Sequence, residues 1–134
     1  MPRYMLDTDI CSFIVKRASE KVLKRLQRTA VEDVSISVIT KAELLYGVDI
    51  SPRQKIDGAA VDAFLAHVAV LDFPDEAAQH YAVIRGHLKR KGAMIGANDL
   101  FIAAHARCLG LTLVTNNARE FSRIPQLKIE NWTA

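Results

Sequence analysis

Short apolar runs recur along the chain, each followed by a longer stretch in which apolar and polar residues alternate. A short apolar run bounded by polar or turn residues is typical of a buried strand. We therefore expect strands at 3–6, 34–37, 70–71 and 111–115, and a last strand around Ile129.

The stretches between these runs carry apolar residues three and four positions apart, which predicts amphipathic helices. Ile102, Ala103 and Ala106, for example, share one helical stripe with Asp99. We expect helices that begin near Thr8 and Ser19, and others at 38–46, 51–67, 74–91, 99–108 and 119–121. Short strands separated by helices predict an α/β fold, a three-layer α/β/α domain with a central, mostly parallel sheet.

Polar residues and glycines mark the predicted helix ends. Thr8, Ser51 and Asn98 stand where an N-cap side chain is expected. Gly47 and Gly110 follow the last apolar residue of a helical stripe, where glycine commonly ends a helix. These signals set the expected boundaries of four helices.

The composition is that of an ordinary globular protein. Half of the 134 residues are hydrophobic and a quarter are charged, so the chain can bury a core without disulfides. The length fits a single domain spanning 1–134. The formal net charge of +3 permits a polyanionic partner such as nucleic acid but does not require one.

Two cysteines, Cys11 and Cys108, lie far apart and match no metal-ligand spacing. We interpret both as free, buried thiols, as expected in a reducing compartment. The start of the chain has no signal-peptide pattern, and no apolar run approaches the roughly 20 residues that span a bilayer. We therefore expect a cytoplasmic protein without a membrane partner.

Acidic and amide side chains stand at comparable places in several predicted elements. Asp7 ends the first strand, Asn116 follows the strand at 111–115, and Asp99 begins a helix. Glu43 is the only acid on the helix at 38–46. Ligands of open parallel sheets bind at the carboxyl ends of the strands. We therefore expect Asp7 and Asn116 to face one crevice that Asp99 and Glu43 can reach.

Carboxylates that converge in this way repel one another, and each raises the pKa of the others. A divalent metal relieves the repulsion, and oxygen-only ligands suit Mg²⁺ or Mn²⁺. Such a site could polarise a phosphodiester and activate water. Thr8, Ser37 and Thr115 carry hydroxyls that could orient the water, or could equally form turn or cap hydrogen bonds.

Each acid also has a purely structural interpretation. Asp7 could cap the first helix, and Asp99 could favour the dipole at the start of its own helix. Glu43 could reach solvent or pair with Lys41 or an arginine. The nuclease hypothesis depends on all three acids meeting in one place.

Four segments carry a family resemblance that spans nearly the whole chain. They are MLDTDICSFIVK, SISVITKAELLYGV, IGANDLFIAAHARCLGLTLVTNNAREFSRI and the closing IENW. Together they resemble the VapC toxins of the PIN-domain family. This resemblance implies a PIN fold, an Mg²⁺- or Mn²⁺-dependent endoribonuclease, a homodimer, and a VapB-type antitoxin as partner. It also implies an RNA substrate, tRNA, with the initiator tRNA cut in its anticodon region.

The resemblance also implies roles for individual residues. The metal-binding acids of the family fall on Asp7, Glu43 and Asp99. A fourth acidic position is less clear, because the segment after the strand at 111–115 reads Thr-Asn-Asn. Asn117 and Glu120 are then expected as secondary contributors. Asp9 stands where relatives often carry asparagine, and it could strengthen metal binding or cap the helix.

Two other interpretations remain open at this stage. The segment LDTDI also resembles the nucleophile motif of haloacid-dehalogenase phosphatases, with Asp7 as nucleophile and Asp9 as acid. The chain could also be a non-catalytic module that binds RNA or an antitoxin.

Overall fold

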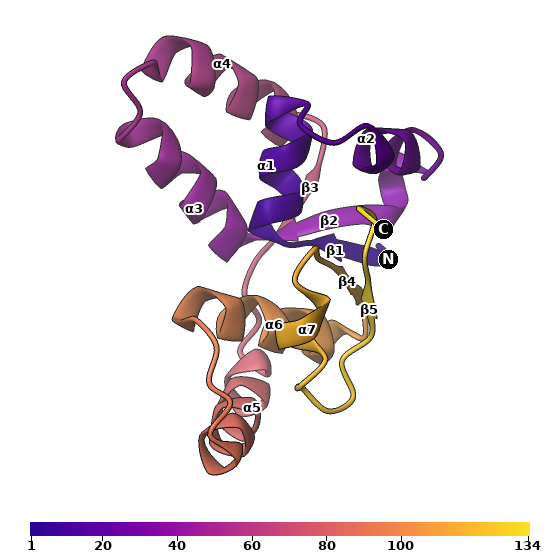
Figure 1. Ribbon diagram of the computed structural model, residues 1–134, viewed down its shortest axis with the longest axis vertical. Helices are drawn as coiled ribbons and strands as arrows, with labels where there is room; N and C mark the ends of the chain where they lie inside the picture. The colour runs from indigo at the N-terminus through magenta and orange to yellow at the C-terminus, as the bar shows by residue number, and fades with distance from the viewer.

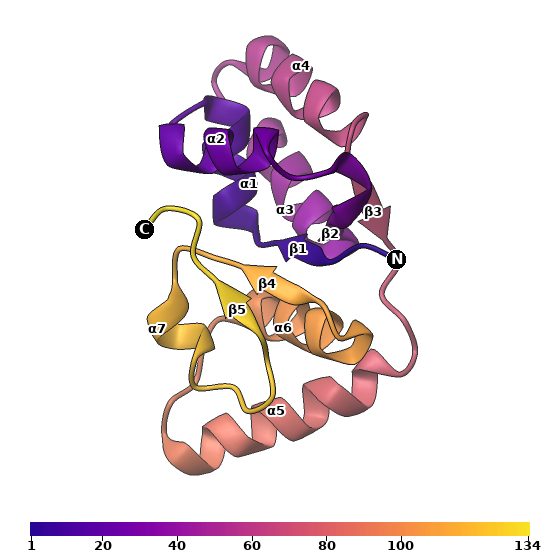
Figure 2. The ribbon, with the colours of Figure 1, turned by 90° about the vertical axis from the view of Figure 1, so that its right-hand side faces the viewer.

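The computed structural model describes residues 1–134, in which a central sheet has helices on both faces (Figures 1 and 2). The strands are short and the helices between them longer, as expected. The strands are β1 (Tyr4–Leu6), β2 (Val34–Ser37), β3 (Ala69–Leu71), β4 (Thr112–Val114) and β5 (Ile129–Glu130). The helices are α1 (Thr8–Lys16), α2 (Glu20–Gln27), the 3₁₀ helix η1 (Val31–Asp33), α3 (Val38–Asp49), α4 (Gln54–Leu65), α5 (Ala77–Lys91), α6 (Ala97–Leu109) and α7 (Ala118–Phe121).

The sheet has the strand order β3-β2-β1-β4-β5, and every neighbouring pair is parallel. From β1 the chain moves outward through β2 to β3, and it then crosses back to β4 and β5. The change of direction falls between β1 and β4, where Leu6 is paired with Val114. A crevice at the carboxyl ends of two such strands is the usual ligand site of this architecture. Asp7 and Thr115 are the next residues at this position.

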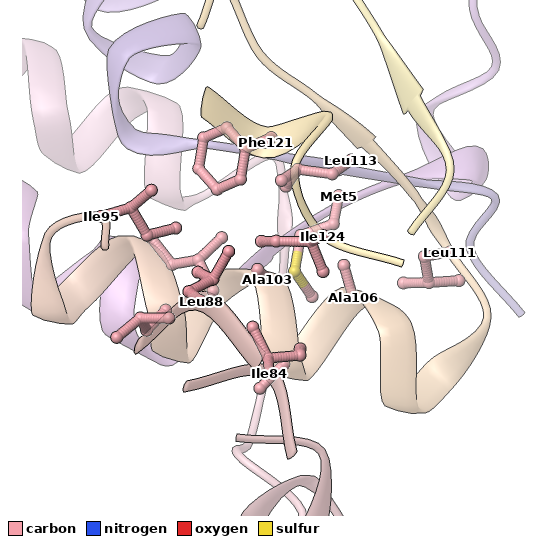
Figure 3. Close-up of a cluster of buried hydrophobic side chains, with 13 residues drawn as sticks. Met5, Ile84, Leu88, Ile95, Ala103, Ala106, Leu111, Leu113, Phe121 and Ile124 are labelled. Atoms are coloured by element: carbon pink, nitrogen blue, oxygen red, sulfur yellow. The ribbon is translucent and has the colours of Figure 1, made fainter. Parts of the chain in front are cut away.

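Each face of the sheet has its own hydrophobic core. Leu6, Ile36 and Val114 belong to the core shared with α1, α2, α3 and α4, which lie together above the sheet in Figure 2. Met5 and Leu113, on the opposite face, belong to the core shared with α5, α6 and α7 (Figure 3). This arrangement confirms the predicted three-layer α/β/α fold with a parallel sheet.

The structure also confirms the stripe of α6. Ile102, Ala103 and Ala106 are completely buried, while Asp99 at the start of the same helix is half-buried. Gly110 ends α6 in the left-handed conformation, with φ of 69°. The glycine is favoured there because an L side chain rarely adopts that backbone conformation.

Three predicted N-caps, at Thr8, Asn98 and Ser51, are wrong. Asp7, rather than Thr8, caps α1, because its Oδ1 accepts a 2.9 Å hydrogen bond from the backbone N–H of Ile10. Helix α6 begins after Gly96, so Asn98 lies within its first turn and its side chain is free for another contact. Ser19 caps α2 as expected.

The prediction for the region between α3 and α4 also needs correction. Helix α3 continues through Gly47 to Asp49, and Val48 in this added turn packs against the core. Helix α4 begins at Gln54 without a side-chain cap, and Ser51 instead accepts a hydrogen bond from the N–H of Arg53. Ile56 lies on α4 in the helical stripe that we expect to be buried from the apolar spacing at 51–67, but its side chain is exposed.

Both cysteines are free, as predicted, although only Cys11 is fully buried. None of the helices combines the length and apolar character that a membrane-crossing segment needs.

Candidate active site

Asp7 directly follows β1, at the point between β1 and β4 where the order of the strands along the sheet changes direction. Its exposed fraction is only 3%. Burial raises the pKa of the Asp7 carboxyl to about 7, against hydrogen bonds from Thr115 and Ile10 that lower it. The charges of Asp9 and Asp99 raise it further. Asp7 therefore does cap its helix, but capping leaves its charge poorly compensated.

Asp99 lies in the first turn of α6, close enough to Asp7 for its charge to raise the pKa of that carboxyl. Burial raises the pKa of its carboxyl to about 6, and the charges of Glu43, Asp9 and Glu120 raise it further. These couplings place Asp99 within electrostatic reach of acids from α1, α3 and α7. The dipole at the start of α6 favours the negative charge, yet the other acids and burial outweigh it.

Glu43 is held by two polar neighbours from different parts of the chain. The Oγ1 atom of Thr8 donates a 2.5 Å hydrogen bond to Oε1 of Glu43, and Nδ2 of Asn98 donates one of 3.2 Å to Oε2. Oγ1 of Thr8 also lies 3.2 Å from Oγ1 of the buried Thr40. Glu43 therefore neither extends freely into solvent nor pairs with Lys41. The contacts link α3 to the starts of α1 and α6.

Glu120 and Asn117 are the two candidates for the fourth acidic position of the site, and they differ in how closely they are linked to the other acids. Glu120 lies half-buried on α7 and contributes to the raised pKa of Asp99. Asn117 precedes α7, and its backbone N–H donates a 2.9 Å hydrogen bond to Oγ1 of Thr115. The Asn117 side chain makes no hydrogen bond to the acids, and Asn116 is exposed. The geometry connects Glu120 to the site more directly than either asparagine.

No lysine or arginine side chain forms an ion pair with these acids. The ion pairs of the molecule join Arg25 to Glu130 and Arg53 to Asp57, both elsewhere. Carboxylates without a cation, supplied only with oxygen-bearing neighbours, form a donor set that suits a hard divalent ion. No three acidic, histidine or cysteine side chains are gathered closely enough to form a complete ligand set.

Sequence reasoning missed the roles of Asn98 and Thr40. Asn98 was expected to cap a helix, yet its side chain contacts Glu43 across 55 residues of sequence. Thr40 precedes Glu43 by three residues, so helical periodicity places both on one face of α3. Only Thr40 could therefore have been found from a local pattern.

The family model of the PIN domain matches residues 4–127. A protein from Haemophilus influenzae strain Rd named "Ribonuclease VapC2" is 42% identical over 132 residues, which cover 98% of this chain and 99% of that protein. This chain belongs to the VapC nucleases of the PIN-domain family. The predicted family is thereby confirmed, and the alternative of a haloacid-dehalogenase phosphatase is ruled out.

Other VapC relatives are similar to this chain in sequence and structure along nearly its whole length. A Salmonella typhimurium protein named "tRNA(fMet)-specific endonuclease VapC" is 42% identical over 98% of this chain and 99% of its own length. The crystal structure of DNA-bound VapBC from the same organism superposes with a TM-score of 0.92, at 42% identity and over 98% and 99% of the two chains. The crystal structure of VapBC2 from Rickettsia felis bound to a DNA fragment from their promoter superposes with a TM-score of 0.90, at 39% identity. The match covers 96% of this chain and 98% of that chain.

Proposed function

We propose that this chain is the toxin of a VapBC-type pair, a divalent-metal-dependent endoribonuclease that hydrolyses RNA phosphodiester bonds and thereby inhibits translation. The observation that carries the proposal is the group of acids around Asp7 and Asp99, whose pKa values are raised and which no basic side chain neutralises. Carboxyl groups with strongly raised pKa values cluster at functional sites in proteins. The nuclease family of the chain supplies the reaction type.

Asp7, Glu43 and Asp99 are the residues that would hold Mg²⁺ or Mn²⁺, with Glu120 and Asn117 as secondary contributors. Their donors are all oxygen atoms, which these two ions prefer. When bound, the ion would polarise the scissile phosphate and lower the pKa of water. Thr8 and Asn98 orient the two oxygens of Glu43, so this acid is preorganised before any ion arrives.

The histidines of the chain support hydrolysis by water rather than attack by the RNA 2′-hydroxyl. His105 is fully buried, His80 accepts a hydrogen bond from Arg107, and His67 contacts the carbonyl of Ala63. None of these contacts reaches the acids, so none of these three histidines is placed to act as general base or acid. Water attack in line at phosphorus would leave a 5′-phosphate and a 3′-hydroxyl.

The proposed substrate is tRNA, and specifically the initiator tRNA cut in its anticodon region. The names of the Salmonella typhimurium and Shigella flexneri relatives, "tRNA(fMet)-specific endonuclease VapC", support it. A single-stranded loop also suits the site, because its phosphates and bases are accessible. The test compares initiator tRNA with elongator methionine tRNA. One cut in the anticodon loop of the initiator alone is expected, and equal cutting of both would contradict the specificity.

The proposed protein partners are a VapB-type antitoxin and a second copy of the chain. A groove of about 350 Å³ runs between α1, α3 and α4 and is lined at one end by Thr8 and Glu43 and farther along by Gly47, Val48 and Val61. An antitoxin segment in this groove would cover Glu43. The similar solved structures are VapBC complexes, which supports this pairing.

The decisive experiment measures tRNA cleavage and Mn²⁺ binding in parallel. Protein stripped with EDTA should not cleave tRNA, and added Mn²⁺ should restore cleavage. Asp99→Asn should abolish cleavage and weaken Mn²⁺ binding while the fold is retained. The control Asp62→Asn changes an exposed acid of α4 and should behave as wild type. Full cleavage by Asp99→Asn, or cleavage in EDTA, would overturn the proposal.

A further inference from the structure

His105 is a polar residue in the interior of the protein with no part in the site described so far. It lies on α6 and is completely buried. Its Nδ1 atom is 2.8 Å from Oγ of Ser37, and its ring makes a T-shaped contact with Phe73, with the ring centroids 5.3 Å apart. Its Nε2 atom has no hydrogen-bond partner.

This unpartnered nitrogen makes the imidazole costly for the fold. A buried polar atom without a hydrogen-bond partner is destabilising, and a leucine of similar size would avoid that cost. Burial lowers the pKa of His105, although a backbone contact with Asp72 opposes the effect, so the neutral ring is favoured. The contact that a leucine could not make is the hydrogen bond with Ser37.

Ser37 is itself completely buried, and it joins two elements. It is the last residue of β2 and the N-cap of α3, and its Oγ accepts a 3.1 Å hydrogen bond from the N–H of Ile39. With Nδ1 of His105 as an acceptor, the Ser37 hydroxyl can donate to the ring while it still caps α3. The Ser37 hydroxyl then both donates a hydrogen bond, to His105, and accepts one, from Ile39.

The positions of the two partners relate this contact to the acids. Glu43 follows Ser37 by six residues along α3, and Asp99 precedes His105 by six residues along α6. Six residues of α-helix span about 9 Å. The Ser37–His105 hydrogen bond therefore links the two helices at matching distances from the acids they carry. At the other end, Asn98 links the same helices through its contact with Glu43.

We propose that His105 is a positioning residue, which through Ser37 fixes α3 against α6 and so sets the separation of Glu43 and Asp99. The inference rests on the proposed function, because the separation matters only if both acids hold one ion. Ligand geometry must be maintained closely for such a site, and residues that orient ligands from outside affect metal affinity.

The test measures the Mn²⁺ dissociation constant of the full chain by calorimetry, together with kcat for tRNA cleavage. His105→Leu should weaken Mn²⁺ binding about 10-fold, the lower range for residues that support metal ligands. His105→Asn should recover most of the affinity, because its amide oxygen can accept from Ser37 where Nδ1 does. Ile102→Val, equally buried on the same helix, removes packing without touching Ser37 and should leave the affinity unchanged.

Ser37→Ala provides an independent route if His105→Leu does not fold, and it should weaken Mn²⁺ binding to a similar degree. Combining the two substitutions should weaken binding little beyond either one, because both remove the same contact. Wild-type Mn²⁺ affinity in folded His105→Leu or Ser37→Ala would overturn the inference. If Asp99→Asn also keeps wild-type Mn²⁺ affinity, the proposed metal site itself is wrong; if Asp99→Asn loses affinity, only the role of His105 fails.

Discussion

Oγ1 of Thr8 donates a 2.5 Å hydrogen bond to Oε1 of Glu43, although 35 residues separate them in sequence. Thr8 begins α1 directly after Asp7, whereas Glu43 lies in the middle of α3. The contact therefore fixes one proposed metal ligand against the element that carries another. Because Glu43 has no basic partner, its orientation depends on this hydroxyl and on the amide of Asn98.

Thr8→Val should weaken Mn²⁺ binding and tRNA cleavage by about 10-fold, since valine keeps the shape of threonine but cannot donate to Glu43. Calorimetry and a cleavage assay check this. Thr112→Val is the matched control, because Thr112 is a β4 residue whose hydroxyl makes no hydrogen bond in the protein. Unchanged Mn²⁺ affinity in Thr8→Val would show that the contact does not orient Glu43 for a metal.

The raised pKa of Asp7 predicts how the stability of the metal-free protein depends on pH. With a pKa of about 7 in the folded state and 3.8 as its ordinary value, Asp7 binds more protons when folded than when unfolded between these limits. The free energy of unfolding therefore falls as the pH rises from about 4 through 7. Asp99, with a pKa of about 6, acts in the same direction.

Asp7→Asn should remove most of this pH dependence and stabilise the EDTA-treated protein at pH 8, by up to about 4 kcal/mol at 1.4 kcal/mol per pKa unit. Asparagine can still cap α1, so the effect isolates the charge. Urea unfolding at pH 5, 6.5 and 8 provides the measurement. The same substitution should abolish cleavage. A variant with the wild-type pH dependence would show that Asp7 is not the group responsible.

Local patterns in the sequence were sufficient to predict the positions of Asp7 and Asp99. Asp7 follows an apolar strand, and Asp99 shares a stripe with residues that are completely buried. Both signals arise within one element, from the alternation of strands or the 3.6-residue period of helices. The parallel sheet then brings strand ends together, as the pairing of Leu6 with Val114 shows.

Contacts between distant segments could not be predicted in this way. Asn98 has the chemistry of a cap, and only the fold shows that its side chain instead contacts Glu43. His105 looks like an ordinary polar position on α6 until the end of β2 is placed beside it. Gly47 was expected to end α3 because glycine commonly follows the last residue of a helix, yet Leu44 and Val48 on either side of it pack against the core and the helix continues.

Trp132 should be important for stability and unimportant for chemistry. It is buried against Tyr4, with ring centroids 5.3 Å apart, and its Nε1 donates a 3.1 Å hydrogen bond to Glu130. The Arg25 guanidinium lies 5.1 Å from the ring centroid and also pairs with Glu130. Trp132→Ala should lower the free energy of unfolding by about 3–5 kcal/mol.

Trp132→Phe retains an aromatic ring against Tyr4 but loses the hydrogen bond to Glu130, so it should cost much less, about 1 kcal/mol beyond the change in ring size. Denaturant unfolding measures both variants, and cleavage per folded molecule should stay at the wild-type level. A reduced Mn²⁺ affinity in Trp132→Phe would contradict this separation of stability from chemistry.

Gly47 offers a way to block the groove between α1, α3 and α4, where we propose that the antitoxin binds, without disturbing the protein. It lies within α3, lines the groove beside Val48, and an added Cβ would meet no atom within 4 Å. Gly47→Ala should therefore stabilise the protein by about 1 kcal/mol, the usual gain of alanine over glycine inside a helix. Urea unfolding checks this first expectation, and the alanine variant becomes the control for a larger side chain.

Gly47→Phe should fill part of the groove while leaving the acids in place. We expect the free variant to cleave tRNA as the alanine variant does, but a VapB-type antitoxin that inhibits the wild-type chain should inhibit it at least 10-fold less tightly, a loss of about 1.4 kcal/mol in binding. Titration of cleavage with antitoxin measures the difference. Inhibition of Gly47→Phe at the wild-type antitoxin concentration would place the antitoxin outside this groove, because an aromatic ring and a bound segment cannot share the same space.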